Sequence, residues 1–162
     1  MGNDIAGYQG AAGVIEMIGA DFDQFIKVYN DIGAAVTNGD CYFLDFVRDV
    51  DSMTVAARPT LEAMATSAVY RQIVVVNNAQ LGKTTIADTE WGYVQIRGYC
   101  PKVKCGSTIA IDDFLQGANA SSTAADDGTT ITIDSFGIAI TDEDTVAGFC
   151  EAILFGVRTN IG

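Results

Sequence analysis

Short apolar runs separated by glycine recur through the second half of the chain. They read WGYVQIRGYC, PKVKCG, STIAIDDFL, TTITIDSFGIAI and AGFCEAILFGVR, and each has about the length of a β-strand. Residues 130–134 (TITID) alternate polar and apolar side chains, which would place one side chain in a core and the next in water. The pattern predicts an antiparallel β module.

The first half is less regular. Residues 1–20 are rich in Gly and Ala, which predicts an N-terminal arm or flexible lead-in before a single β-rich domain over residues 21–162. The apolar positions of residues 22–32 fit either a short helix, capped by Asp21 and ended by Gly33, or a pair of strands. Both structures stay open at this stage.

Residues 37–40 (TNGD) predict a tight turn, because glycine after asparagine accepts a positive φ. CYFLDFV follows as a strand with Phe43 and Leu44 in the core. Thr60 has the features of a helix N-cap, with Glu62 in the first turn, so LEAMATSAVYR predicts a helix. Residues 73–76 (IVVV) predict another strand.

Two further segments complete the expected architecture. Residues 117–128 (GANASSTAADDG) are small, polar and acidic, which predicts an exposed loop. Residues 149–155 (FCEAILF) are apolar on both alternating faces apart from Glu151. This predicts a strand buried on both sides, either at the centre of a sheet or at a subunit contact.

Composition and charge narrow the possible partners. The 162 residues are 49% apolar and 19% charged, which favours one domain with apolar surface buried between identical subunits. The net charge of −12, from 21 acidic and 9 basic residues, disfavours direct binding to nucleic acid or to an anionic membrane. The chain has no 18-residue apolar run and no signal-peptide pattern at its start, so we expect synthesis in the cytosol.

The residue types for several reactions are missing. The sequence contains no histidine, which excludes histidine-dependent triads and mixed Cys/His zinc sites. The four cysteines have no CxxC spacing and are expected as buried free thiols, with a four-thiolate zinc site or a Cys100–Cys105 bridge as alternatives. Gly82-Lys83-Thr84 copies the end of a phosphate-binding loop, but Asn77 stands where the first glycine is needed.

Acidic clusters offer no better candidate. Residues 126–127 (DD) and 142–144 (DED) carry calcium-type oxygen ligands, but their spacing differs from that of an EF-hand loop and favours solvated turns. No pair of carboxylates is singled out for glycoside hydrolysis. We therefore predict a protein that is not an enzyme and has no catalytic residue, metal or cofactor.

One group of residues differs from the acidic background. Three basic residues lie close together around a predicted turn at Pro101, and three aromatic residues share odd-numbered positions with the first of them. They could form a docking surface for an acidic partner, or be solvated bases on a hairpin with the aromatics in the core. The candidate partner-binding residues are Trp91, Tyr93, Arg97, Tyr99, Lys102 and Lys104.

Over residues 70–162 the order of these segments resembles the capsid decoration, or cement, proteins of tailed bacteriophages. The shared features are the WGYVQIRG strand, a valine-bearing return strand, a DDFL element, an acidic loop, an FGIAI strand and a closing AGFCEAILFG strand. Asp112 stands where that family's pattern has glycine, so the geometry of this turn is left open.

The resemblance implies a β-rich homotrimer on the outer surface of the phage head, which stabilises the shell by bridging major capsid protein subunits. We predict a mainly β fold, an antiparallel sandwich or small barrel with one or two short helices, located in the virion. Another virion subunit, such as a tail tube, fibre base or major shell protein, is the alternative. A hydrolase or a sugar-binding β domain is a third class.

Overall fold

Strands dominate the structure, a computed structural model that describes residues 15–17, 23–47, 58–64, 72–118, 121–132, 134–143 and 148–156. The strands are β1 (Ile15–Met17), β2 (Gln24–Tyr29), β3 (Val36–Thr37), β4 (Cys41–Val47), β5 (Arg58–Glu62), β6 (Ile73–Val76), β7 (Thr85–Ile86), β8 (Trp91–Lys104), β9 (Phe114–Gly117), β10 (Ala124–Asp126), β11 (Gly137–Ala139) and β12 (Phe149–Phe155). A 3-10 turn, η1 (Ala79–Leu81), is the helical element of the described residues. Those residues contain no helix long and apolar enough to cross a membrane. The predicted mainly β fold is confirmed.

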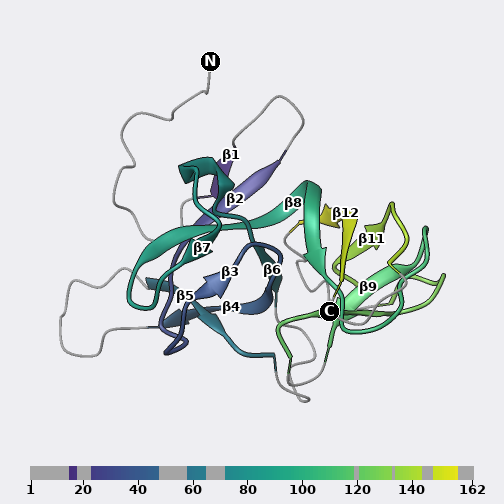
Figure 1. The fold of residues 1–162 in the computed structure, drawn as a ribbon, viewed down its shortest axis with the longest axis horizontal. Coiled ribbons are helices and arrows are strands. Elements are labelled where there is room, and N and C mark those ends of the chain that lie inside the picture. Colours follow the sequence, from purple (N-terminus) through teal and green to yellow (C-terminus); the bar gives the residue numbers. More distant parts are fainter. Residues whose placement is uncertain are drawn as a thin grey trace, which may run out of the picture.

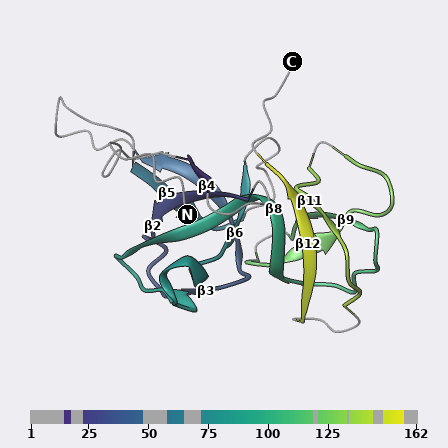
Figure 2. The ribbon, with the colours of Figure 1, turned by 90° about the horizontal axis from the view of Figure 1, so that it is seen from above.

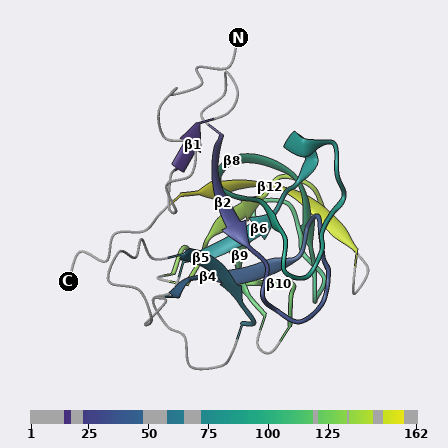
Figure 3. The same cartoon turned by 90° about the vertical axis from the view of Figure 1, so that its left-hand side faces the viewer.

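Five strands close a small barrel. The hydrogen-bonded order is β2-β5-β4-β6-β8, and β2 pairs again with β8 to complete the ring. The β2–β5 contact is parallel, whereas the other contacts of the ring are antiparallel. Figure 3 views the molecule from the end at which the barrel lies. Its interior is an apolar cluster that includes Ile26, Val28, Leu44, Leu61, Val74, Val76, Val94 and Ile96.

A second lobe extends from the barrel along β8, which continues past β2 and β6 to pair with β12 (Figures 1 and 2). From β12 the sheet continues through β11 and β9 to β10. It then curls back onto the end of β8, where Cys105 bridges Ala124 and the Gly106 amide donates to the Ala124 carbonyl at 2.8 Å. The curl encloses a second apolar core.

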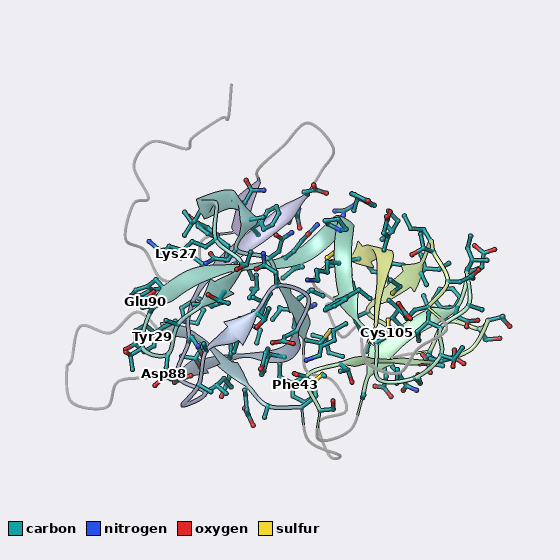
Figure 4. The ribbon with its side chains drawn as sticks, viewed as in Figure 1. Lys27, Tyr29, Phe43, Asp88, Glu90 and Cys105 are labelled. Carbon is teal, nitrogen blue, oxygen red and sulfur yellow. The ribbon has the colours of Figure 1, made fainter. Side chains whose placement is uncertain are left out.

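The two cores share strands β4 and β6. On β4, Leu44 points into the barrel and Phe43 belongs to the second core; on β6, Val74 and Val75 divide in the same way. Both strands are therefore covered on both faces, which explains why successive positions are apolar in CYFL of β4 and in IVVV of β6. Figure 4 labels Phe43 on β4 and Cys105 just after β8, two members of the second core.

Several local predictions are confirmed. Residues 37–40 turn as expected, with Gly39 at φ +100° and the Asp40 amide donating to the Thr37 carbonyl at 3.0 Å. The runs CYFLDFV and IVVV are strands β4 and β6. Of the two structures left open for residues 22–32, the strand is the one that forms, because β2 finds hydrogen-bonding partners in β1, β5 and β8.

The helix predicted to begin at Thr60 is wrong at its start. Thr60 and Glu62 lie in strand β5, and Leu61 pairs with Leu44 of β4 with both side chains buried. A neighbouring strand with free backbone groups outweighs the weak local preference for helix. Residues 65–71, the rest of that segment, lie outside the described residues.

The alternating segment 130–134 is also not a strand in its described residues, and Ile131 is 56% exposed. The Thr132 amide donates to the Ser135 hydroxyl at 2.8 Å, and both hydroxyls bond to Asp127. Such local side-chain bonds hold the backbone in a turn instead of a ladder. Conversely, the predicted loop 117–128 contains strand β10, which pairs with β9 and buries Ala124.

Strand β12 differs from its prediction on one face. Cys150, Ala152 and Leu154 face the core, but Phe149 is 41% and Ile153 is 38% exposed. The prediction of burial on both sides is therefore wrong for a single copy of the chain. No strand of the described residues covers the second face, because β12 stands in one curled layer between β8 and β11.

Candidate interaction surface

All six predicted partner-binding residues lie on β8, and a bend at Gly98 divides them. Gly98 has φ +91°, and its α-carbon lies against Asp23, whose carboxylate accepts the Tyr99 amide at 3.0 Å. Glycine reaches this conformation without steric cost and leaves room for the approach. The first half of β8 is thus a barrel strand, and the second half belongs to the other lobe.

Trp91 and Tyr93 occupy the barrel half. The Trp91 ring is 41% exposed, packs edge-on against Tyr29 at 5.5 Å, and has the Lys27 ammonium 5.7 Å from its centre. Tyr93 is half-buried and pairs with Lys27 across the β2–β8 ladder. Figure 4 shows Lys27 and Tyr29 at this end of the molecule, together with Glu90.

Tyr99, Lys102 and Lys104 occupy the second half, and Arg97 stands just before the bend, where it pairs with Gln24 of β2 and with Phe155 of β12. The predicted turn at Pro101 is wrong, because β8 runs through this position. Cys100 pairs with Ala152 and Val103 with Cys150, so Pro101 and Lys102 together stand opposite Glu151 as a β-bulge. A bulge tolerates proline, since the extra residue needs no ladder hydrogen bond.

The bulge sets the positions of the two lysines. Lys104 is partly buried and its ammonium lies 3.0 Å from Asp40. Lys102 is exposed instead, and its ammonium lies 4.0 Å from the centre of the Phe149 ring. A cation over an aromatic face is stabilised by the ring quadrupole. Lys102 is therefore the more available of the two lysines for a partner.

Tyr99 is fixed by its neighbour strand. Its hydroxyl donates to the Glu151 carboxylate at 2.7 Å, and this hydrogen bond raises the pKa of Tyr99. The bond occupies the one acidic side chain of β12. The exposed face around Tyr99 thus carries aromatic and basic side chains beside the half-buried Glu151 carboxylate, although the whole chain is strongly acidic.

A row of apolar side chains crosses this face from strand to strand. Tyr99 pairs with Ile153, Ile153 with Ile138, and Ile138 with Phe114, so one lateral line joins β8, β12, β11 and β9. The Phe114 and Phe155 rings lie 6.0 Å apart beside it. We call the exposed residues Arg97, Tyr99, Lys102, Phe149 and Ile153 the β8–β12 face.

Sequence reasoning missed Phe149 and Ile153 as surface residues. The sequence did contain a pattern that indicates their exposure, because they alternate with the buried residues Cys150, Ala152 and Leu154 along β12. It was ambiguous because both faces of the strand are apolar, and only the pairing of β12 shows which face is covered.

The loops beside β9 and β11 carry the opposite charge. Asp112, Asp134 and Asp142 are exposed there, as is Asp126 at the end of β10, and the sequence contains no Lys or Arg between Lys104 and Arg158. Two large apolar side chains protrude among the acids, Ile111 at 54% and Ile131 at 56% exposure. We call these six residues the acidic end.

Hydrogen bonds within the chain occupy several carboxylates. Asp142 accepts the Ile111 amide at 2.6 Å and Glu143 accepts the Phe149 amide at 2.8 Å. No group of three or more Cys, Asp or Glu side chains in the described part of the chain could hold a metal ion. Gly82 at φ +66° ends a 3-10 turn, so Gly82-Lys83 does not begin a phosphate-binding helix.

The four cysteines lie buried and free in the second core. Burial raises the pKa of Cys41 well above its usual value and that of Cys100 to about 12. A hydrogen bond with Cys105, together with burial, raises the pKa of Cys150. Cys41, Cys100 and Cys150 therefore stay protonated at neutral pH, and all four cysteines pack as small buried side chains.

No protein-family model matches this sequence, and no curated protein matches it. Among solved structures, the chain is similar to the crystal structure of the head fiber gp8.5 N base in bacteriophage phi29. The match covers 84% of this chain and 97% of that chain, with 14% identity and a TM-score of 0.50. At this identity the likeness shows a shared fold.

Proposed function

We propose that this chain is a non-enzymatic structural protein of a bacteriophage, bound to the outer surface of the assembled head. The observation that carries the proposal is the fold shared with the phi29 head fiber base over 84% of the chain. The resemblance of residues 70–162 to capsid decoration proteins supports the same location. Both point to a module that attaches to a shell.

A head-bound protein of this kind could be a cement protein or a fibre base, and the two differ in their effect on the shell. As a cement protein, the chain would bridge neighbouring capsid subunits as a homotrimer and stabilise the shell. As a fibre base, it would attach a projecting fibre without strengthening the shell. The strand pattern supports the first form, and the fold likeness supports the second.

Binding to an assembled lattice needs only weak contacts from each copy. Several copies joined in one oligomer bind together only where the sites have the right spacing, so affinity multiplies on the shell and not on free subunits. We assign head binding to Trp91 and Lys27, because Trp is the residue type most enriched at binding hot spots and this ring is exposed.

Co-sedimentation tests the proposal. The purified protein is mixed with expanded empty heads of its phage and, separately, with unassembled capsid protein. We expect it to sediment with heads and to ignore free subunits, and Trp91→Ala should weaken head binding by about tenfold or more. Leu81→Ala, at another exposed apolar position, is the matched control. Equal binding to free subunits would contradict the proposal.

Heating separates the two forms. DNA-filled heads with and without the protein are warmed, and DNA release is followed with an intercalating dye. A cement protein raises the temperature of release, because its binding energy favours the intact shell. A fibre base leaves that temperature unchanged although it sediments with the heads.

A further inference from the structure

We propose that copies of this chain bind one another head to tail, with the β8–β12 face of one copy against the acidic end of the next. The proposal concerns the purified chain alone, so it does not depend on the role in the phage head. It assigns a partner to three of the predicted residues of β8: Arg97, Tyr99 and Lys102.

The β8–β12 face has the composition of an interface centre. Tyr99, Phe149 and Ile153 are each about two-fifths exposed and lie on adjacent strands. Arg97 and Lys102 flank them, and Tyr and Arg are among the residues enriched at hot spots. The Tyr99–Glu151 hydrogen bond holds the aromatic ring in place before any partner arrives, which lowers the entropy cost of binding.

The acidic end complements this face in charge, and it also exposes large apolar side chains. Asp112 follows Ile111 and Asp134 lies three residues after Ile131 in the sequence, and these two isoleucines are the most exposed large apolar residues of the described part of the chain. Hydrogen bonds from the Ala110 amide to Asp113 at 2.8 Å and from the Ile111 amide to Asp142 fix the turn that presents Ile111. Apolar side chains can therefore meet apolar ones while Arg97 and Lys102 meet carboxylates.

Charge selects a head-to-tail contact over a two-fold one. If two β8–β12 faces met, Arg97 and Lys102 of one copy would face the same bases of the other. If two acidic ends met, carboxylates would face carboxylates. Like charges across an interface are costly. Two copies with a net charge of −12 each repel one another. That repulsion is lowered when the exposed bases of one copy contact the segment of the next copy that contains acidic residues but no Lys or Arg.

The two surfaces can be used at once. The face lies on β8 and β12, whereas the acidic end lies on loops beside β9 and β11, at the end of the molecule away from β2 and β5 (Figures 1 and 2). Each copy thus has one donor and one acceptor surface. A heterologous contact of this kind closes into a ring when the rotation between copies allows it.

Complementation between two variants tests the proposal. A face variant carries Arg97→Glu and Lys102→Glu, and an end variant carries Asp112→Asn and Asp134→Lys; all four side chains are exposed. Light scattering should give a discrete oligomer for the native chain and a monomer for each variant, with the dissociation constant raised on the order of a hundredfold. Lys27→Glu with Lys83→Glu, which makes the same charge change on the barrel half, should stay oligomeric.

An equimolar mixture of the two variants gives the decisive result. The intact end of the face variant can bind the intact face of the end variant, and neither copy can bind a third. We expect a capped dimer, which should dissociate as salt is added because its charge pairs are exposed. A native chain that is monomeric, or folded variants that stay monomeric when mixed, would overturn the proposal. Circular dichroism checks that each variant is folded. If a double variant fails to fold, the single variant Lys102→Glu replaces the face variant, or Asp134→Lys replaces the end variant.

Discussion

At the scale of single residues, Asp112 links sequence pattern to backbone geometry. It occupies the position where the decoration-protein pattern has glycine, and its φ is +68°. The turn therefore has the left-handed conformation that glycine favours, although an aspartate occupies it. Aspartate tolerates this region better than most residues but still places its β-carbon close to the backbone.

Asp112→Gly should stabilise the fold. Removing the β-carbon relieves a left-handed cost of roughly 1–2 kcal/mol, and the added freedom of glycine in the unfolded chain offsets part of it. We expect a net gain of about 0.5 kcal/mol in the free energy of unfolding by urea denaturation. Asp113→Gly is the matched control and should destabilise, because Asp113 accepts the Ala110 amide. A loss of stability in Asp112→Gly would show that the aspartate side chain supports the turn.

The buried thiols make stability depend on alkaline pH. Unfolded cysteine ionises near pH 9, whereas Cys100 in the fold stays protonated up to about pH 12. Between these values the unfolded chain binds fewer protons, so stability is complete below pH 9 and falls as pH rises. Each such thiol contributes a slope of up to about 1.4 kcal/mol per pH unit.

Urea midpoints at pH 8, 9 and 10 measure this slope. Cys100→Ala should unfold with a shallower decline than the native chain above pH 9, after the constant cost of its smaller side chain is subtracted. Identical slopes would mean that Cys100 is open to solvent in the fold.

At the scale of elements, β8 shows where local reasoning fails. WGYVQIRGYC and PKVKCG predict two strands with a turn between them, because proline and glycine usually mark turns. In the structure Pro101 lies in a bulge and Gly98 in a bend, and the strand continues through both. The reason is tertiary: β12 pairs on both sides of the bulge and supplies the hydrogen bonds.

Gly98→Ala should be strongly destabilising. A β-carbon there would meet the Asp23 carboxylate and would also adopt a positive φ. We expect a loss of roughly 2–4 kcal/mol in urea unfolding. Gly82→Ala separates the two causes, because Gly82 has φ +66° with open space around its α-carbon, and it should cost about 1 kcal/mol. Equal losses at both positions would mean that Asp23 moves away freely.

Strands with a clear run and a nearby turn were predictable from sequence, as with β4, β6 and β12. Elements defined by their partners were not: β5 has helix-like residues, and β10 lies in a segment with loop composition. For the candidate surface, the odd-numbered positions of β8 did identify exposed Trp91, Arg97 and Tyr99. Its extension onto β12 needed the strand pairing, which no local pattern contains.

At the scale of the whole molecule, the two lobes are joined by more than a linker. Strands β4 and β6 contribute one face to the barrel core and the other to the second core, and β8 runs through both lobes. Neither core can be exposed without uncovering half of the shared strands. This arrangement predicts one cooperative unfolding transition.

Leu115→Ala tests that coupling. Leu115 is fully buried in the second core on β9, away from the barrel, so its truncation should cost about 3 kcal/mol. The single tryptophan, Trp91, lies in the barrel wall and reports on the other lobe. We expect the Trp91 fluorescence midpoint in urea to fall by the same amount as the circular dichroism midpoint. A fluorescence midpoint that stays at its native value while circular dichroism shows an earlier step would mean that the lobes unfold separately. In that case the β8–β12 face and the acidic end could open while the barrel stays folded, and self-association would be lost at lower urea than barrel structure.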